Sequence, residues 1–208
     1  YPREWTRLRT QKRLIAFAWG PNGGGEMERV AQLEIVVTAG TGGKGTVWID
    51  DLIFREREPP APYTLTPAVR ASASPKAAAR IVDGDTSTAW RGLSGEQTLT
   101  IDFLKEREFG GLVLYWDSVD HASSYVLESS DDGMRWETVY AVERGNGGRD
   151  PIYLPESETR HLRLRLRQSA SGWGYALREI EVKPVEWSLT PNAFFAGLAK
   201  VAPRGTYP

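Results

Sequence analysis

Cysteine is missing from this chain of 208 residues, and its absence excludes several kinds of chemistry. Without thiols the chain can form no disulfide, no thiolate nucleophile and no cysteine-ligated zinc site. An excess of one charge is missing too, since 26 basic and 27 acidic residues leave a formal net charge of −1. Basic residues alternate with acids in stretches such as "FREREPP" and form no block. The sequence therefore predicts no nucleic-acid partner and no membrane partner.

Long apolar runs are also absent, and none approaches the ~20 residues that a membrane-spanning helix needs. The chain opens on "YPREW", with neither a methionine nor a signal peptide. We interpret it as a piece of a longer polypeptide, for which we expect a secreted, periplasmic or cell-surface location.

Short segments of strand length, separated by Gly, Pro, Asn, Asp and Ser, make up the centre of the chain. In the clearest of them, leucines 162, 164 and 166 alternate with arginines, so that a strand would bury one face. Asp132-Gly133 is typical of a tight turn between two strands. The segments predicted as strands are 97–103, 111–117, 124–130, 135–143 and 159–168. This pattern predicts an all-β fold, an antiparallel jelly-roll β-sandwich.

Charges followed by prolines at 59, 60 and 62 indicate a stiff connector near the first quarter of the chain. Three further strands are predicted before it, at 11–21, 31–40 and 45–54, which are too few to close a sandwich. We therefore interpret the start as a partial β-sandwich. The predicted divisions are the C-terminal part of an upstream jelly roll (1–58), a linker (59–64), the main domain (65–184), and a linker with a helix (185–208).

A short helix is predicted near the end of the chain. Thr190 suits the N-cap, Pro191 the first helical position, and Pro203 the terminating position. Phe194, Phe195 and Leu198 have helical spacing and form an apolar stripe. Such a helix could dock on its neighbours or lead into a further domain.

The stretch "RIVDGDTSTAWRG" (80–92) combines carboxylates, hydroxyls and a glycine. Calcium takes six to eight oxygen ligands, and Asp83, Asp85 and Thr88 around Gly84 could supply several of them. An ordinary polar turn has the same composition, as does the edge of a binding site. The local pattern leaves these three interpretations open.

Six ordered motifs between residues 65 and 183 resemble the discoidin domain, the coagulation-factor C-type module. They are "ASASPKAAARIVDGDTSTAW", "TLTIDF", "LVLYWD", "SYVLESSDDGMRWETV", "RHLRLRL" and "WGYALREIEVKP". Many bacterial carbohydrate-binding modules share this fold, which is galactose-binding-domain-like. More weakly, "GGKGTVWIDDLIF" is similar to the last strand of jelly rolls beside glycosidase domains. The tail from Pro191 is similar to the lead-in to a helical glycosidase domain.

The resemblance implies one structural calcium that joins the loop after residue 80 to the last strand. Carried over to this sequence, the ligands are the carbonyls of Arg80 and Arg178 and the side chains of Asp83, Asp85, Thr88 and Glu179. Such an ion would stabilise the fold without catalysing a reaction, because protein oxygens fill its coordination sphere. Alternatively, these acids are solvated or hydrogen-bonded turn residues.

Discoidin domains bind ligands through loops at one end, here expected at 90–97, 117–124, 143–150 and 169–176. Aromatic side chains there could stack on sugar rings, while directional polar groups bind hydroxyls. The predicted ligand-binding residues are Arg91, Asp117, His121, Asn146, Arg149, Trp173 and Tyr175. Trp90 and Trp116 are interpreted as core. The galactose-binding branch usually carries a histidine shortly after the opening tryptophan, and "WRGLSGEQT" has none, which argues against a galactose preference.

These observations favour a non-catalytic carbohydrate-binding module of a multidomain glycoside hydrolase. Its partners would be carbohydrate and the catalytic domain of the same polypeptide. One alternative is an architectural spacer that binds no sugar, and another is a cell-surface adhesion module. A catalytic role is disfavoured, because the neighbouring Asp117 and Asp120 lie in one polar loop without an apolar wall to raise a pKa.

Overall fold

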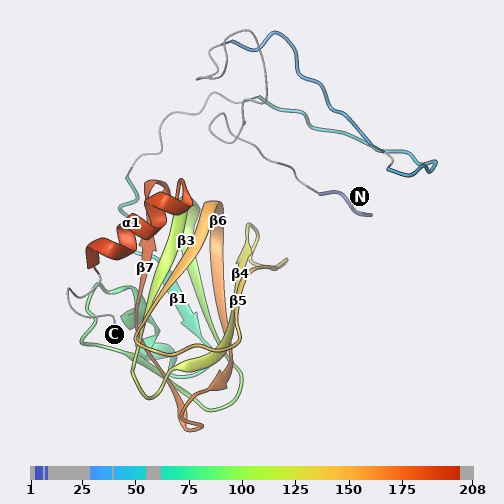
Figure 1. Cartoon of the computed structure of the whole chain (residues 1–208). Helices are drawn as coiled ribbons and strands as arrows, with labels where there is room; N and C mark the ends of the chain where they lie inside the picture. Colours follow the sequence, from blue (N-terminus) through green and yellow to red (C-terminus); the bar gives the residue numbers. More distant parts are fainter. Residues whose placement is uncertain (1–2, 7, 9–28, 39, 55–61, 202–208) are drawn as a thin grey trace. The chain divides into compact units, whose positions relative to one another are not determined.

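The computed structural model describes residues 3–6, 8, 29–38, 40–54 and 62–201. The chain divides into two compact units, Tyr1–Arg55 and Glu56–Pro208. The second unit contains every helix and strand of the described residues (Figure 1).

The second unit is built from one antiparallel sheet of seven strands. The hydrogen-bonded order is β2-β7-β3-β6-β4-β5, and β1 pairs with β3 outside this path. The elements in chain order are β1 (Ala68–Ala71), η2 (Pro75–Val82), β2 (Trp90–Leu93), β3 (Gln97–Trp116), β4 (Ala122–Ser130), β5 (Glu137–Val142), β6 (Arg149–Ser169), β7 (Gly174–Lys183), η3 (Val185–Trp187) and α1 (Pro191–Val201). This arrangement confirms the predicted all-β, antiparallel fold class.

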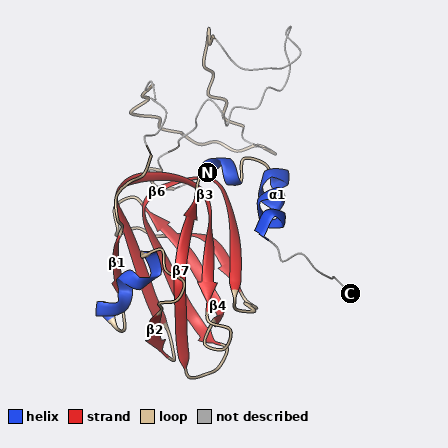
Figure 2. Ribbon diagram, turned by 90° about the vertical axis from the view of Figure 1, so that its left-hand side faces the viewer, coloured by secondary structure: helices blue, strands red, loops and turns tan. Residues whose placement is uncertain are grey.

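Two long strands, β3 and β6, run beside each other and bend together. Their register shifts between Asp102 and Arg107 and again between Phe109 and Gly111. The segments predicted as separate strands, 97–103 and 111–117, are thus largely the two halves of β3. Because both strands bend over, one continuous hydrogen-bonded sheet forms both faces of the predicted jelly-roll sandwich and encloses the core (Figure 2).

The β4–β5 connection is the turn that Asp132-Gly133 predicts. Gly133 has a φ of 72°, a left-handed conformation that glycine adopts without steric cost. The Asp132 carboxylate accepts hydrogen bonds from the backbone N–H groups of Met134 and Arg135, each at 2.8 Å. Local chemistry therefore fixes this turn.

The core lies inside the curled sheet and confirms the alternation read from the sequence. Leu162, Leu164 and Leu166 are buried, while the intervening arginines remain partly accessible on the opposite face. Trp90 and Trp116 are also buried, as predicted. The indole N–H of Trp90 donates to the carbonyl of Ala73 at 2.9 Å, so its one polar atom is satisfied.

Three helical elements, η2, η3 and α1, accompany the sheet in the described residues, and only α1 was expected. The 3₁₀ helix η2 was not predicted; it buries Ala78 and Ile81 against the core. The predicted helix is α1, in which the hydroxyl of Thr190 accepts a hydrogen bond from the N–H of Ala193 at 3.1 Å. None of the helices in the described residues is long and apolar enough to cross a membrane.

One face of α1 packs as predicted, with an exception. Phe194 is buried against Trp187 and Tyr153, with ring centroids 4.8 and 5.0 Å away. Phe195 was expected in the same stripe but is 63% exposed, because it follows Phe194 directly and points to another side of the helix. The predicted terminator, Pro203, lies outside the described residues.

In the first unit, the described residues form no strand. Strands were predicted at 31–40 and 45–54, while the third, 11–21, lies outside the described residues. The apolar side chains of Val36, Trp48 and Phe54 are exposed. Isolated strands need a hydrogen-bonded partner and a covered face, so a segment whose apolar face stays uncovered gains little from forming one. Its assignment to an upstream jelly roll stays a prediction.

The leucine row of β6 makes a specific prediction about stability. Leu164 pairs with Leu99 of β3 and Leu127 of β4, and all three are buried. We expect Leu164→Ala to lower the free energy of unfolding by about 2–5 kcal/mol, through lost burial and a residual cavity. Arg167→Ala, at an exposed position of the same strand, should change it by less than about 0.5 kcal/mol. Urea denaturation of both variants measures the difference, and equal effects would contradict the assigned faces.

Candidate functional site

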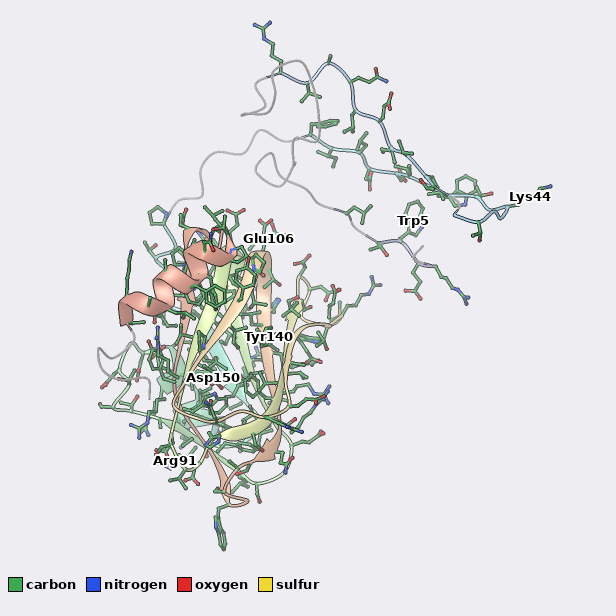
Figure 3. The ribbon with its side chains drawn as sticks, viewed as in Figure 1. Trp5, Lys44, Arg91, Glu106, Tyr140 and Asp150 are labelled. Carbon is green, nitrogen blue, oxygen red and sulfur yellow. The ribbon has the colours of Figure 1, made fainter. Side chains whose placement is uncertain are left out.

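Four loops meet at one end of the second unit, which we call the rim: residues 93–97, 117–122, 143–149 and 169–174. Backbone hydrogen bonds join three of them to one another or to the ends of the neighbouring strands. The N–H of Asp117 donates to the carbonyl of Ala176 at 3.0 Å, and the N–H of Ala170 donates to the carbonyl of His121 at 2.9 Å. A third links Trp116 to Gly148. Arg91 lies at this end of the second unit and Glu106 at the other end (Figure 3). The expected grouping of the loops is thus observed.

Trp173 is the most exposed aromatic side chain of the rim, with 86% of its surface accessible. Its turn is held by serine hydroxyls. That of Ser171 accepts from the N–H of Trp173 at 3.2 Å, and that of Ser169 donates to the carbonyl of Gly174 at 2.5 Å. Leu93, also exposed, lies opposite Gly174 in the β2–β7 ladder. The rim therefore presents a flat indole on a hydrogen-bonded turn.

Tyr175 was predicted to contact ligand, and the structure corrects this prediction. The side chain is only 1% exposed and belongs to the core. Its hydroxyl donates to the carbonyl of Gly95 at 2.8 Å. Strand alternation directs residue 175 inward, so Tyr175 supports the rim from beneath.

Asp117 was also predicted as a ligand-binding residue, and its carboxylate is already occupied. It accepts from the N–H groups of Val119 and Asp120, at 3.0 and 3.3 Å, and from the Arg178 guanidinium at 2.8 Å. The N–H of Val119 and the Arg178 guanidinium help to lower the pKa of Asp117 to about 2. The residue holds the loop in shape, which leaves little capacity for a ligand.

The other predicted rim residues differ in accessibility. Asn146 is exposed, whereas His121 and Arg149 are half-buried. Nδ1 of His121 is buried and has no hydrogen-bond partner among the described residues. It packs against Gly147, where an added Cβ would lie only 2.6 Å away. Arg149 lies opposite Tyr115 in the β3–β6 ladder. Asn146 is therefore the most accessible of the three.

A hollow of about 410 Å³ lies beside the rim, where η2, β2 and β7 meet. Three arginine side chains from these elements line it, together with two hydroxyl residues and an alanine. The lining residues are Arg80, Ser87, Thr88, Ala89, Arg91 and Arg178. Of the three arginines, only Arg91 was predicted to act through its side chain. No local motif signals the grouping, because η2 and β7 are far apart in the chain.

Next to the hollow, the loop after η2 is hydrogen-bonded to β7. We call this region, residues 83–88 together with Glu179, the acidic clasp. The buried carboxylate of Glu179 accepts a hydrogen bond from the N–H of Gly84 at 2.9 Å. The Thr88 hydroxyl donates to a carboxylate oxygen of Asp83 at 2.9 Å and lies 3.2 Å from the carbonyl of Asp85. The sequence thus correctly placed Asp83, Thr88 and Glu179 in one structural region.

Asp85 takes part in the acidic clasp differently from the prediction. Its carboxylate accepts from the N–H of Ser87 at 2.8 Å, and the residue is exposed. Consequently, no three acidic or histidine side chains within the described residues are grouped to hold a metal. Any cation here would depend on carbonyl and hydroxyl oxygens as well as on Asp83 and Glu179.

Ionisation of Glu179 in the acidic clasp is unfavourable without a cation. Burial, together with the nearby Asp83 carboxylate, raises the pKa of Glu179 to about 7, although the Gly84 N–H acts in the opposite direction. A buried acid beside a second acid favours its neutral form. A cation at this point would reverse that preference.

Solved structures similar to this chain are carbohydrate-binding modules. Chitosan-binding module 2 of a chitosanase/glucanase from Paenibacillus sp. IK-5, in complex with chitotriose, is 25% identical, with a TM-score of 0.54; the match covers 59% of this chain and 99% of that one. Module 1 of the same enzyme is 28% identical, with a TM-score of 0.53, over 58% of this chain and 96% of that one.

A third structure, CpGH89CBM32-6 from Clostridium perfringens, shares the fold at 20% identity and a TM-score of 0.51, over 57% of this chain and 94% of that one. No curated protein matches the chain. The family model of the F5/8 type C domain matches residues 67–180, more than half of the sequence. The chain therefore belongs to the F5/8 type C domain family.

Proposed function

We propose that the second unit is a non-catalytic carbohydrate-binding module that holds a glycan at its rim. The observation that carries this proposal is the indole of Trp173, 86% exposed on a hydrogen-bonded turn. The chitosan-binding modules, at 25% and 28% identity, support it.

The chemistry of the rim suits a sugar. The C–H face of a pyranose can pack on an indole ring, and guanidinium and amide groups bind its hydroxyls directionally. Arg91 and Asn146 are the exposed polar side chains among the predicted rim residues. Weak binding of this kind serves by tethering, since it raises the local concentration of a polymer near a linked active site.

The acids at the rim do not suit catalysis. Asp117 is held ionised by its hydrogen bonds, with a pKa of about 2, so it cannot serve as a general acid near neutral pH. Asp120 lies 3.5 Å from Arg91. We therefore assign the reaction to another domain of the parent polypeptide, which we infer to be a glycoside hydrolase. A secreted, periplasmic or cell-surface location suits a module for polymeric glycans.

Trp173→Ala should weaken glycan binding at least about tenfold, because the stacking surface is lost. Met134→Ala, at an exposed apolar position on the β4–β5 turn, is the matched control and should bind like the wild type. A glycan array, followed by titration calorimetry on the best ligand, measures the effect. Circular dichroism should show both variants folded.

Binding that survives Trp173→Ala would contradict the proposed site. A folded wild type that binds no glycan would instead favour the architectural spacer. Sedimentation with liposomes checks the adhesion alternative, since Leu93, Val119 and Trp173 are all exposed on rim loops. We expect no liposome binding.

We further infer that calcium binds at the acidic clasp. The ligands would be the Asp83 and Glu179 carboxylates, the Thr88 hydroxyl and backbone carbonyls, an all-oxygen set of the kind calcium prefers. The carbonyls of Arg80 and Arg178 follow from the family resemblance, and we assign Asp85 its carbonyl, since its carboxylate bonds to Ser87. When bound, the ion neutralises the paired acids and cross-links the loop to β7.

The raised pKa of Glu179 predicts a pH dependence with a definite sign. A carboxyl whose folded pKa of about 7 exceeds its ordinary value of 4.5 binds more protons in the folded state between these values. In EDTA, stability should therefore fall as the pH rises from 5 to 8, by no more than about 3 kcal/mol. Calcium should restore it at pH 8, because the ion favours the ionised form.

Glu179→Gln is the matched variant for this test. It should remove this part of the pH dependence in EDTA and most of the calcium response. The contribution of the half-buried Asp150, whose pKa is also raised by burial, should remain unchanged. Thermal melts at pH 5 and pH 8, with EDTA or calcium chloride, measure both effects. An unchanged melting temperature of the wild type on adding calcium at pH 8 would refute the calcium assignment.

A further inference from the structure

Beside the rim, three guanidinium groups surround one hollow, and we propose that it receives the carboxylate of an acidic sugar unit, such as a uronic acid residue in a polymeric glycan. This inference rests on the proposed glycan-binding function and adds the class of sugar. The sequence alone left the sugar undefined, because the family uses the same fold for different ligands. It assigned two of the three arginines only through their backbone carbonyls.

The composition of the hollow carries the first step. Arg80, Arg91 and Arg178 supply three positive side chains, and Ser87 and Thr88 supply hydroxyls. No aspartate or glutamate is among the lining residues. The formal net charge of the chain is only −1, so this concentration of positive charge is local and does not reflect a basic chain. A site lined in this way favours an anionic group over a neutral one.

The three arginines are held to different degrees. Arg178 is fixed by the Asp117 carboxylate at 2.8 Å and by the carbonyl of Thr86 at 3.3 Å. Arg91 lies 3.5 Å from Asp120, and its side chain is 64% exposed. Such a long, solvated pair contributes little, so the guanidinium of Arg91 can exchange this partner for a ligand.

Arg80 is the least restrained of the three arginine side chains. Its guanidinium donates to the carbonyl of Ala89 at 3.3 Å. Within the described part of the chain, no carboxylate lies within ion-pair distance of it. A guanidinium has five N–H donors, so Arg80 retains donors for a ligand. Arg80 and Arg91 are therefore the pair that can bind an anion, beside an Arg178 held in place by the fold.

The geometry of the donors favours a carboxylate. The planar fork of a guanidinium matches the two oxygens of a carboxylate and forms paired, charge-assisted hydrogen bonds. Arg91 lies on β2, whose last residue, Leu93, pairs with Gly174 next to Trp173. The hollow and the indole thus flank the same pair of strands. One glycan chain could place a ring on Trp173 and an acidic group in the hollow.

The same charges disfavour a cationic polymer. Chitosan carries ammonium groups at mildly acidic pH, and arginines repel them. This chain is similar to modules that bind chitosan, so the arginine-lined hollow predicts a different preference within the same fold.

The experiment compares two forms of one polymer. Polygalacturonate and its highly methyl-esterified form share a backbone and differ mainly in carboxylate charge. Affinity electrophoresis and calorimetry at low salt should show at least about tenfold tighter binding to the acid form. Chitosan at pH 6 should bind more weakly than polygalacturonate.

Variants assign the effect to the hollow. Arg80→Gln should weaken polygalacturonate binding about tenfold and leave binding of the methyl ester unchanged. Arg91→Gln should weaken binding of both polymers, and of the acid form more, because Arg91 also belongs to the proposed hydroxyl-binding rim. Arg135→Gln removes the same charge from the exposed β4–β5 turn and should have no effect. Thermal melts confirm that all three variants are folded.

The outcomes separate this inference from the proposed function. Equal binding of the acid and the ester, with loss in Trp173→Ala, would overturn the acidic-sugar assignment and leave the glycan-binding function standing. Binding of no glycan at all would refute both. Tighter binding to dextran sulfate than to polygalacturonate, or an equal loss in Arg135→Gln, would refute a carboxylate-specific hollow and indicate a general attraction to polyanions.

Discussion

The antiparallel pairing of β3 with β6 is the constraint on which the rest of the structure depends. Both strands bend together near Asp102 and Phe109, so that each contributes to the two opposing faces of the shell. Leu99 and Leu164 lie in one half of this pairing, and Leu112 and Ile152 in the other, all of them buried. Because of this bend, each of the two strands begins and ends at the same end of the domain. Loops that are distant in the sequence therefore lie together at the rim.

Most of the polar groups described at the rim form hydrogen bonds that fix the conformation of its loops. Asp117 binds two backbone N–H groups and Arg178. Tyr175 bonds to a carbonyl of the neighbouring 93–97 loop, and Ser169 to a carbonyl at the end of its own loop. A buried polar group without a partner costs free energy, so this use is expected where loops pack closely. The groups left for a ligand are those that the scaffold does not need, chiefly the exposed Trp173 and Arg91.

The acidic clasp and the arginine-lined hollow are adjacent, since Thr88 takes part in both. Glu179 is buried beside Asp83, an arrangement that disfavours ionisation of Glu179. A cation at the clasp would stabilise the loop between Asp83 and Thr88 and would add positive potential next to the hollow. Ion binding and recognition of an acidic ligand would then favour each other, because both depend on the position of this loop.

The sequence by itself determined the local features. Alternation in residues 159–168 predicted strand β6 and its buried leucines, Asp132-Gly133 predicted a turn, and Thr190-Pro191 predicted the start of α1, because each depends on backbone geometry within a few residues. The order of six motifs indicated the family. Only the tertiary structure decided that 97–103 and 111–117 are one bent strand, that Tyr175 faces inward, and that Asp117 is occupied. It also brought Arg80 and Arg178 to one hollow, since side-chain direction and partners depend on elements far apart in the chain.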